Sequence, residues 1–205
     1  MRGLIQQVKK TIKEWKMLSR GSAVVAAVSG GADSVVMLRL LCELSQEMGL
    51  RVIVAHMDHG LRGRESRRAH DFVPALAKSL GLEFASRRLE KGELKGLGGS
   101  AQEAARVKRY AFLEETAAKY RAQRVALGHT ADDQAETVIM RLMKGSSLSG
   151  LSGIPPKRGM FIRPLIQSSR SSVEEYARER SIAFVPASTN LTPKYLRNSV
   201  RLELI

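Results

Sequence analysis

The sequence predicts an α/β fold of the Rossmann-like type, in which a parallel sheet carries helices on both faces. Short apolar runs alternate with longer amphipathic stretches in the order β-α-β-α-β-α-β-α over the first part of the chain. Helix start and stop signals separate these stretches, among them the capping pair Ser100 and Glu103 and the stop residues Gly49 and Gly81. The length of 205 residues fits a single domain.

The strands and helices of this sheet follow one another in a regular order. The apolar run Ala23–Val28 predicts a buried first strand, and the helix after it, Asp33–Gly49, carries a leucine-rich face. The further strands expected are Arg51–Met57, Leu82–Arg87 and Arg124–Leu127. The further helices expected are Glu65–Leu80, which contains Pro74, then Ser100–Arg121 and Ala131–Met143.

Both ends of the chain add elements to this core. Apolar residues of the stretch 1–20 fall on one helical face, which predicts a first helix docked on the domain; a membrane-surface helix or a transit peptide is the alternative. After Lys144 the sequence GSSLSGLSGIPPKRG predicts a long loop. Ser171 with Glu174 predicts the cap of a last helix, and Ala183–Val185 predicts a short final strand.

Charge and cysteine content restrict the classes of partner and site. The chain has 34 Lys and Arg residues against 20 Asp and Glu residues, and the net charge of +14 predicts attraction to nucleic acid or to an anionic membrane surface. The single cysteine, Cys42, excludes an intrachain disulfide and a cysteine-based metal cluster, and it fits a reducing, cytoplasmic location. No apolar run approaches the roughly 20 residues that span a bilayer.

The segment Ser29–Ser34 joins the first strand to the helix after it, where parallel α/β sheets bind their ligands. Gly30 and Gly31 let the backbone approach a ligand closely, and the N–H groups at the helix start favour an anion such as phosphate. The segment lacks both the Walker A ending and the GxGxxG pattern, which disfavours γ-phosphate transfer and dinucleotide binding. The alternative is an ordinary turn in which Asp33 or Ser34 caps the helix.

The segment His56–Arg62 follows the second strand. In isolation its two histidines and Asp58 suggest a metal site, but zinc is disfavoured because no further His or Cys lies at a ligand spacing. The alternative is a turn in which Asp58 and His59 bond local backbone groups.

The segment Gly128–Thr137 follows the fourth strand and is the richest in chemistry. Asp132, Asp133 and Glu136 have i,i+3 and i,i+4 spacings, which place them on one face of the helix. Clustered carboxylates beside a phosphate loop suit Mg²⁺, which binds through one or two carboxylates plus substrate phosphates, and a carboxylate here could also accept a proton from an amine. The alternative is a capping role, with Thr130 as N-cap and the aspartates stabilising the helix dipole.

These segments together resemble the PP-loop ATP pyrophosphatases, and among them the tRNA(Ile)-lysidine synthetases. SGGADS resembles the pyrophosphate loop, HMDHGLR resembles an element that lines the adenosine pocket, and GHTADDQAET matches its family element residue for residue. ARVKRY, RPL and YLRNSVR resemble further elements, so the resemblance covers about residues 20–201. The fold that it implies is the adenine nucleotide alpha-hydrolase-like PP-loop domain.

The resemblance implies an ATP-dependent ligase that forms a C–N bond. ATP would adenylate O2 of the wobble cytidine in the CAU anticodon of tRNA(Ile) and release pyrophosphate. The ε-amine of free lysine would then attack C2 and expel AMP, leaving lysidine. The partners implied are ATP with Mg²⁺, tRNA(Ile) and free lysine, with no membrane, and a homodimer stays open.

The resemblance also implies roles for individual residues. Those implied to bind ATP are Ser29, Gly30, Gly31, Ala32, Asp33, Ser34, Met57, His59, Gly128 and His129. Those implied to be catalytic are Asp33, Arg106, Arg109, Asp133 and Glu136, with Asp33 and Asp133 as Mg²⁺ ligands. Those implied to bind tRNA are Arg62, Arg141, Lys144, Arg197 and Arg201. Lys144 stands where the family usually has Arg and Ala187 where it has Asp, which puts the role of that carboxylate in doubt.

Two other functions stay open on the sequence. A PP-loop tRNA thiolation enzyme also adenylates a nucleobase oxygen, but the relevant members carry CxxC pairs, whereas Cys42 is alone. A non-catalytic module that binds adenine nucleotides would keep the glycine loop but would not need the carboxylates.

We expect one PP-loop catalytic domain over residues 1–205. It would consist of the helix at 1–20, a nucleotide-binding core at 21–143, and a loop with a C-terminal extension at 144–205. Because the chain ends inside a family motif, we expect further tRNA-binding domains to follow it.

Overall fold

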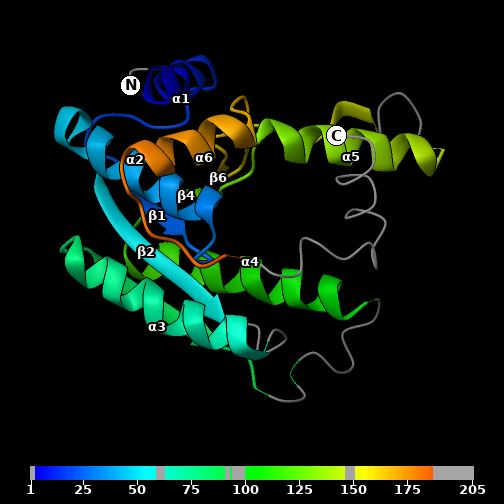
Figure 1. Cartoon of the computed structure of the whole chain (residues 1–205). Coiled ribbons are helices and arrows are strands. Elements are labelled where there is room, and N and C mark those ends of the chain that lie inside the picture. Colours follow the sequence, from blue (N-terminus) through cyan, green and yellow to red (C-terminus); the bar gives the residue numbers. More distant parts are fainter. Residues whose placement is uncertain (1–2, 59–62, 91–92, 94–99, 146–150, 187–205) are drawn as a thin grey trace.

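The computed structural model describes residues 3–58, 63–90, 93, 100–145 and 151–186, and they form one α/β unit (Figure 1). In this part of the chain the sheet has six strands in the order β3-β2-β1-β4-β6-β5. The strands are β1 (Ala23–Ala27), β2 (Arg51–Asp58), β3 (Glu83–Arg88), β4 (Arg124–Ala126), β5 (Lys157–Arg158) and β6 (Phe161–Ile162). All neighbouring strands run parallel except β5 and β6, which pair antiparallel.

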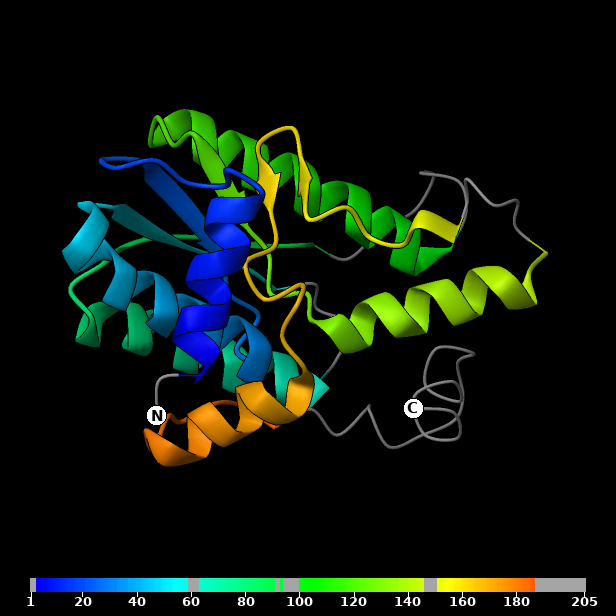
Figure 2. The same ribbon diagram turned by 90° about the horizontal axis from the view of Figure 1, so that it is seen from above.

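Helices cover both faces of the sheet (Figure 2). The helices are α1 (Gly3–Glu14), α2 (Ala32–Met48), α3 (Gly63–Ser79), α4 (Ala101–Lys119), α5 (Ala131–Met143) and α6 (Arg170–Glu179). Successive residues of β1 point to opposite faces, so that Val24 belongs to the buried cluster that contains residues of α1, α2, α3 and α6, while Val25 belongs to the cluster that contains residues of α4. Both faces of the central strands are therefore buried, as expected for a parallel sheet.

The strand order creates a switch point between β1 and β4. The chain leaves β1 through α2 on one face of the sheet, and it reaches β4 through α4 on the opposite face. A crevice is expected beyond the carboxyl ends of two such strands. Helix α5 leaves β4 at this edge and runs away from the sheet, as both views show (Figures 1 and 2).

The predicted strands and helices of the core are confirmed to within about two residues at their ends, and α5 has the bounds that were predicted. The N-terminal helix docks on the domain, because Leu4, Val8 and Ile12 of α1 are buried in the core that α2 shares. The structure contains no helix, among the residues it describes, that is long and apolar enough to cross a membrane.

Two predictions for the C-terminal third are wrong, and one element was not predicted. The described part of the long loop after Lys144 ends in the hairpin β5–β6, which was not predicted and whose strand β6 joins the sheet by pairing Phe161 with Val125. Residues 183–185 form no strand, although the Val185 N–H donates to the Gly30 carbonyl at 2.9 Å. The cap of α6 is Ser169 rather than Ser171, since the Ser169 hydroxyl accepts from the backbone N–H at position 172.

Candidate functional site

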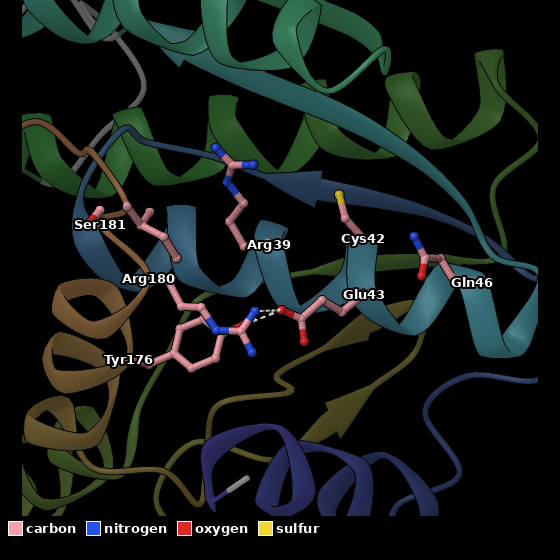
Figure 3. Close-up of a pocket in the computed structure, with 8 residues that line it drawn as sticks. Arg39, Cys42, Glu43, Gln46, Tyr176, Arg180 and Ser181 are labelled. Carbon is pink, nitrogen blue, oxygen red and sulfur yellow. Dashed lines mark hydrogen bonds and ion pairs between the residues drawn. The ribbon is translucent and has the colours of Figure 1, made fainter. Parts of the chain in front are cut away.

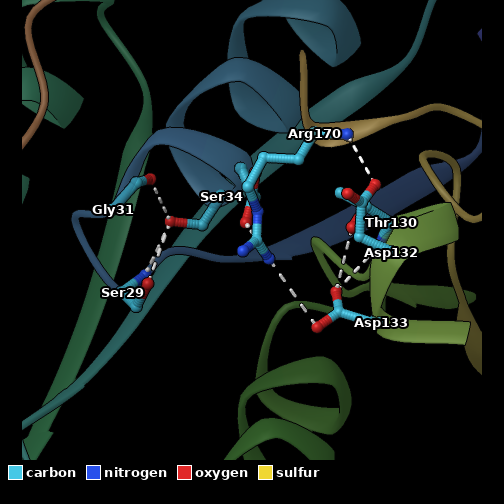
Figure 4. Close-up of polar contacts among 8 residues, drawn as sticks. Ser29, Gly31, Ser34, Thr130, Asp132, Asp133 and Arg170 are labelled. Carbon is cyan, nitrogen blue, oxygen red and sulfur yellow. Dashed lines mark hydrogen bonds and ion pairs between the residues drawn. The ribbon is translucent and has the colours of Figure 1, made fainter. Parts of the chain in front are cut away.

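The glycine loop Ser29–Ser34 is closed by its own serines (Figure 4). The Ser34 hydroxyl donates to the Gly31 carbonyl at 2.9 Å and accepts from the Ser29 N–H at 3.1 Å. The hydroxyls of Ser29 and Ser34 lie 3.1 Å apart. Gly31 occupies the N-cap position of α2, and no described side chain caps this helix. The alternative in which Asp33 or Ser34 caps α2 is therefore wrong. The uncapped N–H groups of a first helical turn favour an anion at this position.

Gly30 and Gly128 are glycines for steric reasons. Gly30 has a φ of +95°, and a Cβ added there would lie 3.3 Å from the Cβ of Ala69. A Cβ at Gly128 would lie 3.1 Å from the backbone nitrogen of Ser34 and 3.2 Å from the carbonyl carbon of Asp33. The chain leaving β4 therefore packs directly against the first turn of α2, and this contact brings the second polar segment beside the glycine loop.

Three carboxylates and one arginine meet where α2, α5 and α6 begin (Figure 4). The Arg170 guanidinium lies 3.7 Å from the Asp33 carboxylate and 4.0 Å from the Asp133 carboxylate. The Arg170 backbone N–H donates to the Asp132 carboxylate at 2.7 Å. Burial raises the pKa of Asp33 to about 6; Arg170 opposes this shift, and the negative charge of Asp133 adds to it. The predicted carboxylate cluster thus exists, and it includes Asp33 from the glycine loop.

Asp133 of α5 combines a capping role with a contact to Arg170. The Asp133 carboxylate accepts from the Thr130 N–H at 2.8 Å and from the Thr130 hydroxyl at 3.3 Å, which confirms a capping role for this residue. Its second oxygen faces Arg170, so capping uses only one of the two carboxylate oxygens.

Glu136 is only 1 % exposed, which is unusual for a carboxylate and is not explained by a cap.

A cationic cluster forms the wall of the site on the α4 side. Arg106 and Arg109 lie over the ring of Tyr110, with guanidinium carbons 5.0 and 5.8 Å from its centroid. The Tyr110 ring packs edge-on against Phe161, at 4.7 Å between centroids. Burial lowers the pKa of Arg109, and the neighbouring charge of Arg106 lowers it further. Because like charges are held together here, the cluster is suited to an anionic ligand.

His129 lies among these cations at the end of β4. Burial lowers the pKa of His129 to about 4; Asp133 opposes the shift, and the charges of Arg163, Arg109 and Arg106 add to it. The Nδ1 atom of His129 is buried and makes no hydrogen bond among the described residues. His129 is therefore neutral at pH 7, and its ring can donate or accept one hydrogen bond toward a ligand.

The return loop after α5 is pinned to that helix, a contact that the sequence did not reveal. The Gln134 amide donates to the Ile154 carbonyl at 2.7 Å and accepts from the Ile154 N–H at 2.5 Å. Gly153 has a φ of +70°, and a Cβ there would clash with the Gln134 side chain. Arg141 donates to the Gly153 carbonyl at 3.1 Å.

The other residues of the predicted segments differ in their exposure to solvent. Met57 is half-buried in β2, and Lys144 is exposed at the end of α5. His56 is buried, with its Nδ1 2.8 Å from the Val28 carbonyl oxygen, so its ring belongs to the core. The predicted residues that lie outside the described residues are His59, Arg62, Ala187, Arg197 and Arg201.

A separate cavity of about 310 Å³ lies between α2 and α6 (Figure 3). At its mouth the Tyr176 hydroxyl donates to Glu43 at 2.7 Å, and Arg180 pairs with the same carboxylate at 2.6 Å. These contacts hold α6 against α2. They are at the far end of α6 from Arg170 and contain none of the residues predicted for the site.

The donor atoms at the crevice fit a magnesium ion that arrives with phosphates. The Oδ1 atom of Asp33 is buried without a hydrogen-bond partner among the described residues, and it is a hard oxygen donor. The described residues include no group of three His, Cys, Asp or Glu side chains arranged to hold a metal by themselves. Magnesium commonly takes only one or two carboxylates and completes its shell with water and phosphate oxygens, which is the arrangement that Asp33 and Asp133 allow.

The fold and this site define an α/β domain with a glycine-rich loop at its switch point. A family model described as the PP-loop domain matches residues 3–205, and the chain belongs to this family.

Two relatives and one solved structure show how the similarity is distributed. The chain is 41% identical over 206 aligned residues to a tRNA(Ile)-lysidine synthase of Symbiobacterium thermophilum, covering 98% of this chain and 43% of that protein. It is 43% identical to a tRNA(Ile)-lysidine synthase of Solibacter usitatus, covering 92% of this chain and 41% of that protein. The structure of the U34-tRNA thiolase NcsA from Methanococcus maripaludis, with its [4Fe-4S] cluster, shares the fold with a TM-score of 0.80 at 21% identity, covering 97% of this chain and 70% of that one. The chain thus spans less than half the length of the curated relatives that it matches.

Proposed function

We propose that the chain is the ATP-using catalytic domain of a tRNA(Ile)-lysidine synthase. In this reaction ATP adenylates O2 of the wobble cytidine in a CAU anticodon and releases pyrophosphate. The ε-amine of lysine then forms a bond to C2, the C2–O bond to AMP breaks, and the amine loses its proton. The observation that carries the proposal is the proximity of the glycine loop, Asp33 and Asp133 to the arginine cluster of α4, in a chain that aligns over 98% of its length with such a synthase.

The glycine loop would hold the ATP phosphates. The N–H groups at the start of α2, which no side chain caps, would bind phosphate oxygens, and Gly128 would leave room for α2 to stay close to the chain that leaves β4. Asp33 and Asp133 would hold Mg²⁺, which when bound would neutralise charge on the phosphates. Met57, His59 and His129 would line the nucleotide pocket.

The lysine step needs a group that removes a proton. The free ε-amine has a pKa of about 10.4, so near pH 7 it arrives as an ammonium ion and must lose a proton before it attacks. Glu136 would accept this proton, and Asp133 would help to attract the ammonium through its negative charge. Glu136 is suited to the task because its side chain is buried, one helical turn after Asp133.

The basic residues would act on the phosphates and on the tRNA. Arg106 and Arg109 would stabilise the charge that develops on the leaving pyrophosphate. The residues proposed to contact the tRNA backbone are Arg62, Arg141, Lys144, Arg197 and Arg201. Such phosphate contacts position the tRNA but do not read its sequence. We further propose a cytoplasmic location and additional tRNA-binding domains beyond this one.

The thiolation alternative has less support. The structural neighbour NcsA is a thiolase with a [4Fe-4S] cluster, but at 21% identity it shows the fold alone. This chain has one cysteine, Cys42, and it lies within α2, so the chain cannot supply the cysteine ligands of such a cluster.

The proposal is tested by incorporation of labelled lysine into tRNA(Ile) with a CAU anticodon, using ATP and Mg²⁺. We expect label in this tRNA and none in the methionine tRNA that carries the same anticodon. A chain that binds ATP and the tRNA but transfers no lysine would overturn the proposal. Sulfur transfer in place of lysine would identify the thiolation chemistry instead.

A further inference from the structure

Arg170 is the first residue of α6, and its backbone is fixed at the site. The Arg170 N–H donates to the Asp132 carboxylate at 2.7 Å, and the Ala131 N–H donates to the Ser168 carbonyl at 2.9 Å. These two hydrogen bonds tie the start of α6 to the start of α5, and Ser169 caps α6 immediately before Arg170. The arginine side chain therefore begins from a rigid point beside the crevice.

From this point the side chain reaches two carboxylates on different helices. Its Nη2 atom lies 3.7 Å from an oxygen of Asp33 in α2 and 4.0 Å from an oxygen of Asp133 in α5. Both distances are too long for hydrogen bonds but within range for ion pairs. The side chains of Arg170, Asp33 and Asp133 are 21%, 28% and 14% exposed, so their charges are partly removed from water and interact more strongly than surface charges do.

We propose that Arg170 is a positioning residue that acts as a built-in counter-ion: it holds Asp33 and Asp133 together before ATP binds, and a divalent cation displaces it when the cation enters with the ATP phosphates. This inference rests on the proposed magnesium site at these two aspartates.

The electrostatic reason is competition for the same oxygens. A divalent cation that enters without nucleotide meets a fixed positive charge between its two ligands, which weakens its binding. ATP supplies phosphate oxygens, and a guanidinium binds these well as a planar pair of donors. Once Arg170 has turned to a phosphate, Asp33 and Asp133 are released for the cation. Cation binding and nucleotide binding are thereby coupled. Without ATP, Arg170 occupies the two aspartates, and the cation binds them only weakly.

The test measures Mn²⁺ binding to the whole chain by electron paramagnetic resonance, which counts free Mn²⁺ and needs no catalysis. In the absence of nucleotide, Arg170→Gln is expected to bind Mn²⁺ at least about tenfold more tightly than the wild type, because a positive charge has been removed from the site. Arg170→Lys keeps the charge and is expected to bind Mn²⁺ as weakly as the wild type. Arg180→Gln, on the same helix but paired with Glu43, is the matched control and should also leave Mn²⁺ affinity unchanged.

Further variants separate a failure of this inference from a failure of the proposed function. Adding Asp133→Asn to Arg170→Gln should abolish the gain in Mn²⁺ affinity. If Arg170→Gln folds but binds Mn²⁺ no more tightly than the wild type, while Asp133→Asn still weakens binding in the presence of a non-hydrolysable ATP analogue, the counter-ion role is wrong and the cation site stands.

If Asp133→Asn changes Mn²⁺ binding under neither condition, the proposed cation site itself is wrong. Arg170→Met serves as a second neutral variant should Arg170→Gln not fold, which circular dichroism would show. A purely structural role for Arg170 predicts lower stability and weaker Mn²⁺ binding in both neutral variants, the opposite of the expected result.

Discussion

Replacing Gly128 by alanine tests the packing that brings the two halves of the site together. The added Cβ would lie 3.1 Å from the Ser34 nitrogen and 3.2 Å from the Asp33 carbonyl carbon. Both neighbours are backbone atoms of the first turn of α2, so they cannot move as the end of a flexible side chain can. The strand end and the helix must therefore separate by a few tenths of an ångström, and overpacking of this kind costs about 1–3 kcal/mol.

The expected result of Gly128→Ala is a folded protein that melts about 2–12 °C lower, since each kcal/mol shifts the melting temperature of a domain of this size by about 2–4 °C. The shift of α2 also displaces the glycine loop, which we propose holds the ATP phosphates, so we expect ATP-dependent activity to fall by up to about 100-fold. Gly31→Ala is the control for stability, because its Cβ would meet only the Ser29 hydroxyl at 3.8 Å, an ordinary contact.

Thermal melting followed by circular dichroism and steady-state kinetics with ATP measure both effects. A Gly128→Ala variant with wild-type stability and an unchanged KM for ATP would refute the reasoning that β4 must touch the first turn of α2.

Three other predictions follow from single contacts. Asp133→Asn and Glu136→Gln should each lower lysine incorporation by about 100-fold or more while ATP still protects the protein from thermal unfolding; wild-type incorporation in both variants would contradict their roles. The raised pKa of Asp33 means that this carboxyl stabilises the fold below its unfolded pKa near 4, and that this stability is lost as pH rises through about 6. Asp33→Asn should therefore be more stable than the wild type at pH 7, by roughly 1–3 kcal/mol, with the difference vanishing below pH 4 in urea titrations. Ser169→Ala should lower the free energy of unfolding by about 1 kcal/mol through loss of the α6 cap, whereas Ser171→Ala should leave it unchanged in the same titrations.

Most strands and helices of the core could be predicted from local sequence signals. The bounds of α5 were predictable because Thr130 and Asp133 mark its start and an amphipathic pattern continues to Met143. The position of the glycine loop Ser29–Ser34 was also predictable, since paired glycines between a buried strand and a helix allow the tight turn that this connection needs. These features depend on neighbours in sequence.

The parts that were missed depend on contacts between distant segments. Strand β6 has two residues, too few to show a period, and it exists because Phe161 pairs with Val125 across the sheet. Arg170 follows a serine-rich stretch with no catalytic pattern, and its role depends on where α6 meets α5. Gln134 was inside a recognised motif, but its partner Ile154 could be identified only once the return loop was placed.

The central claim is that this crevice splits ATP between its α- and β-phosphates to activate a tRNA base. The most direct measurement is the identity of the nucleotide products formed with tRNA(Ile) carrying a CAU anticodon, with and without lysine. The account predicts AMP and pyrophosphate in amounts equal to the lysidine formed, and no turnover when the tRNA is omitted. Release of ADP and phosphate, or AMP formation that does not depend on the tRNA, would contradict it.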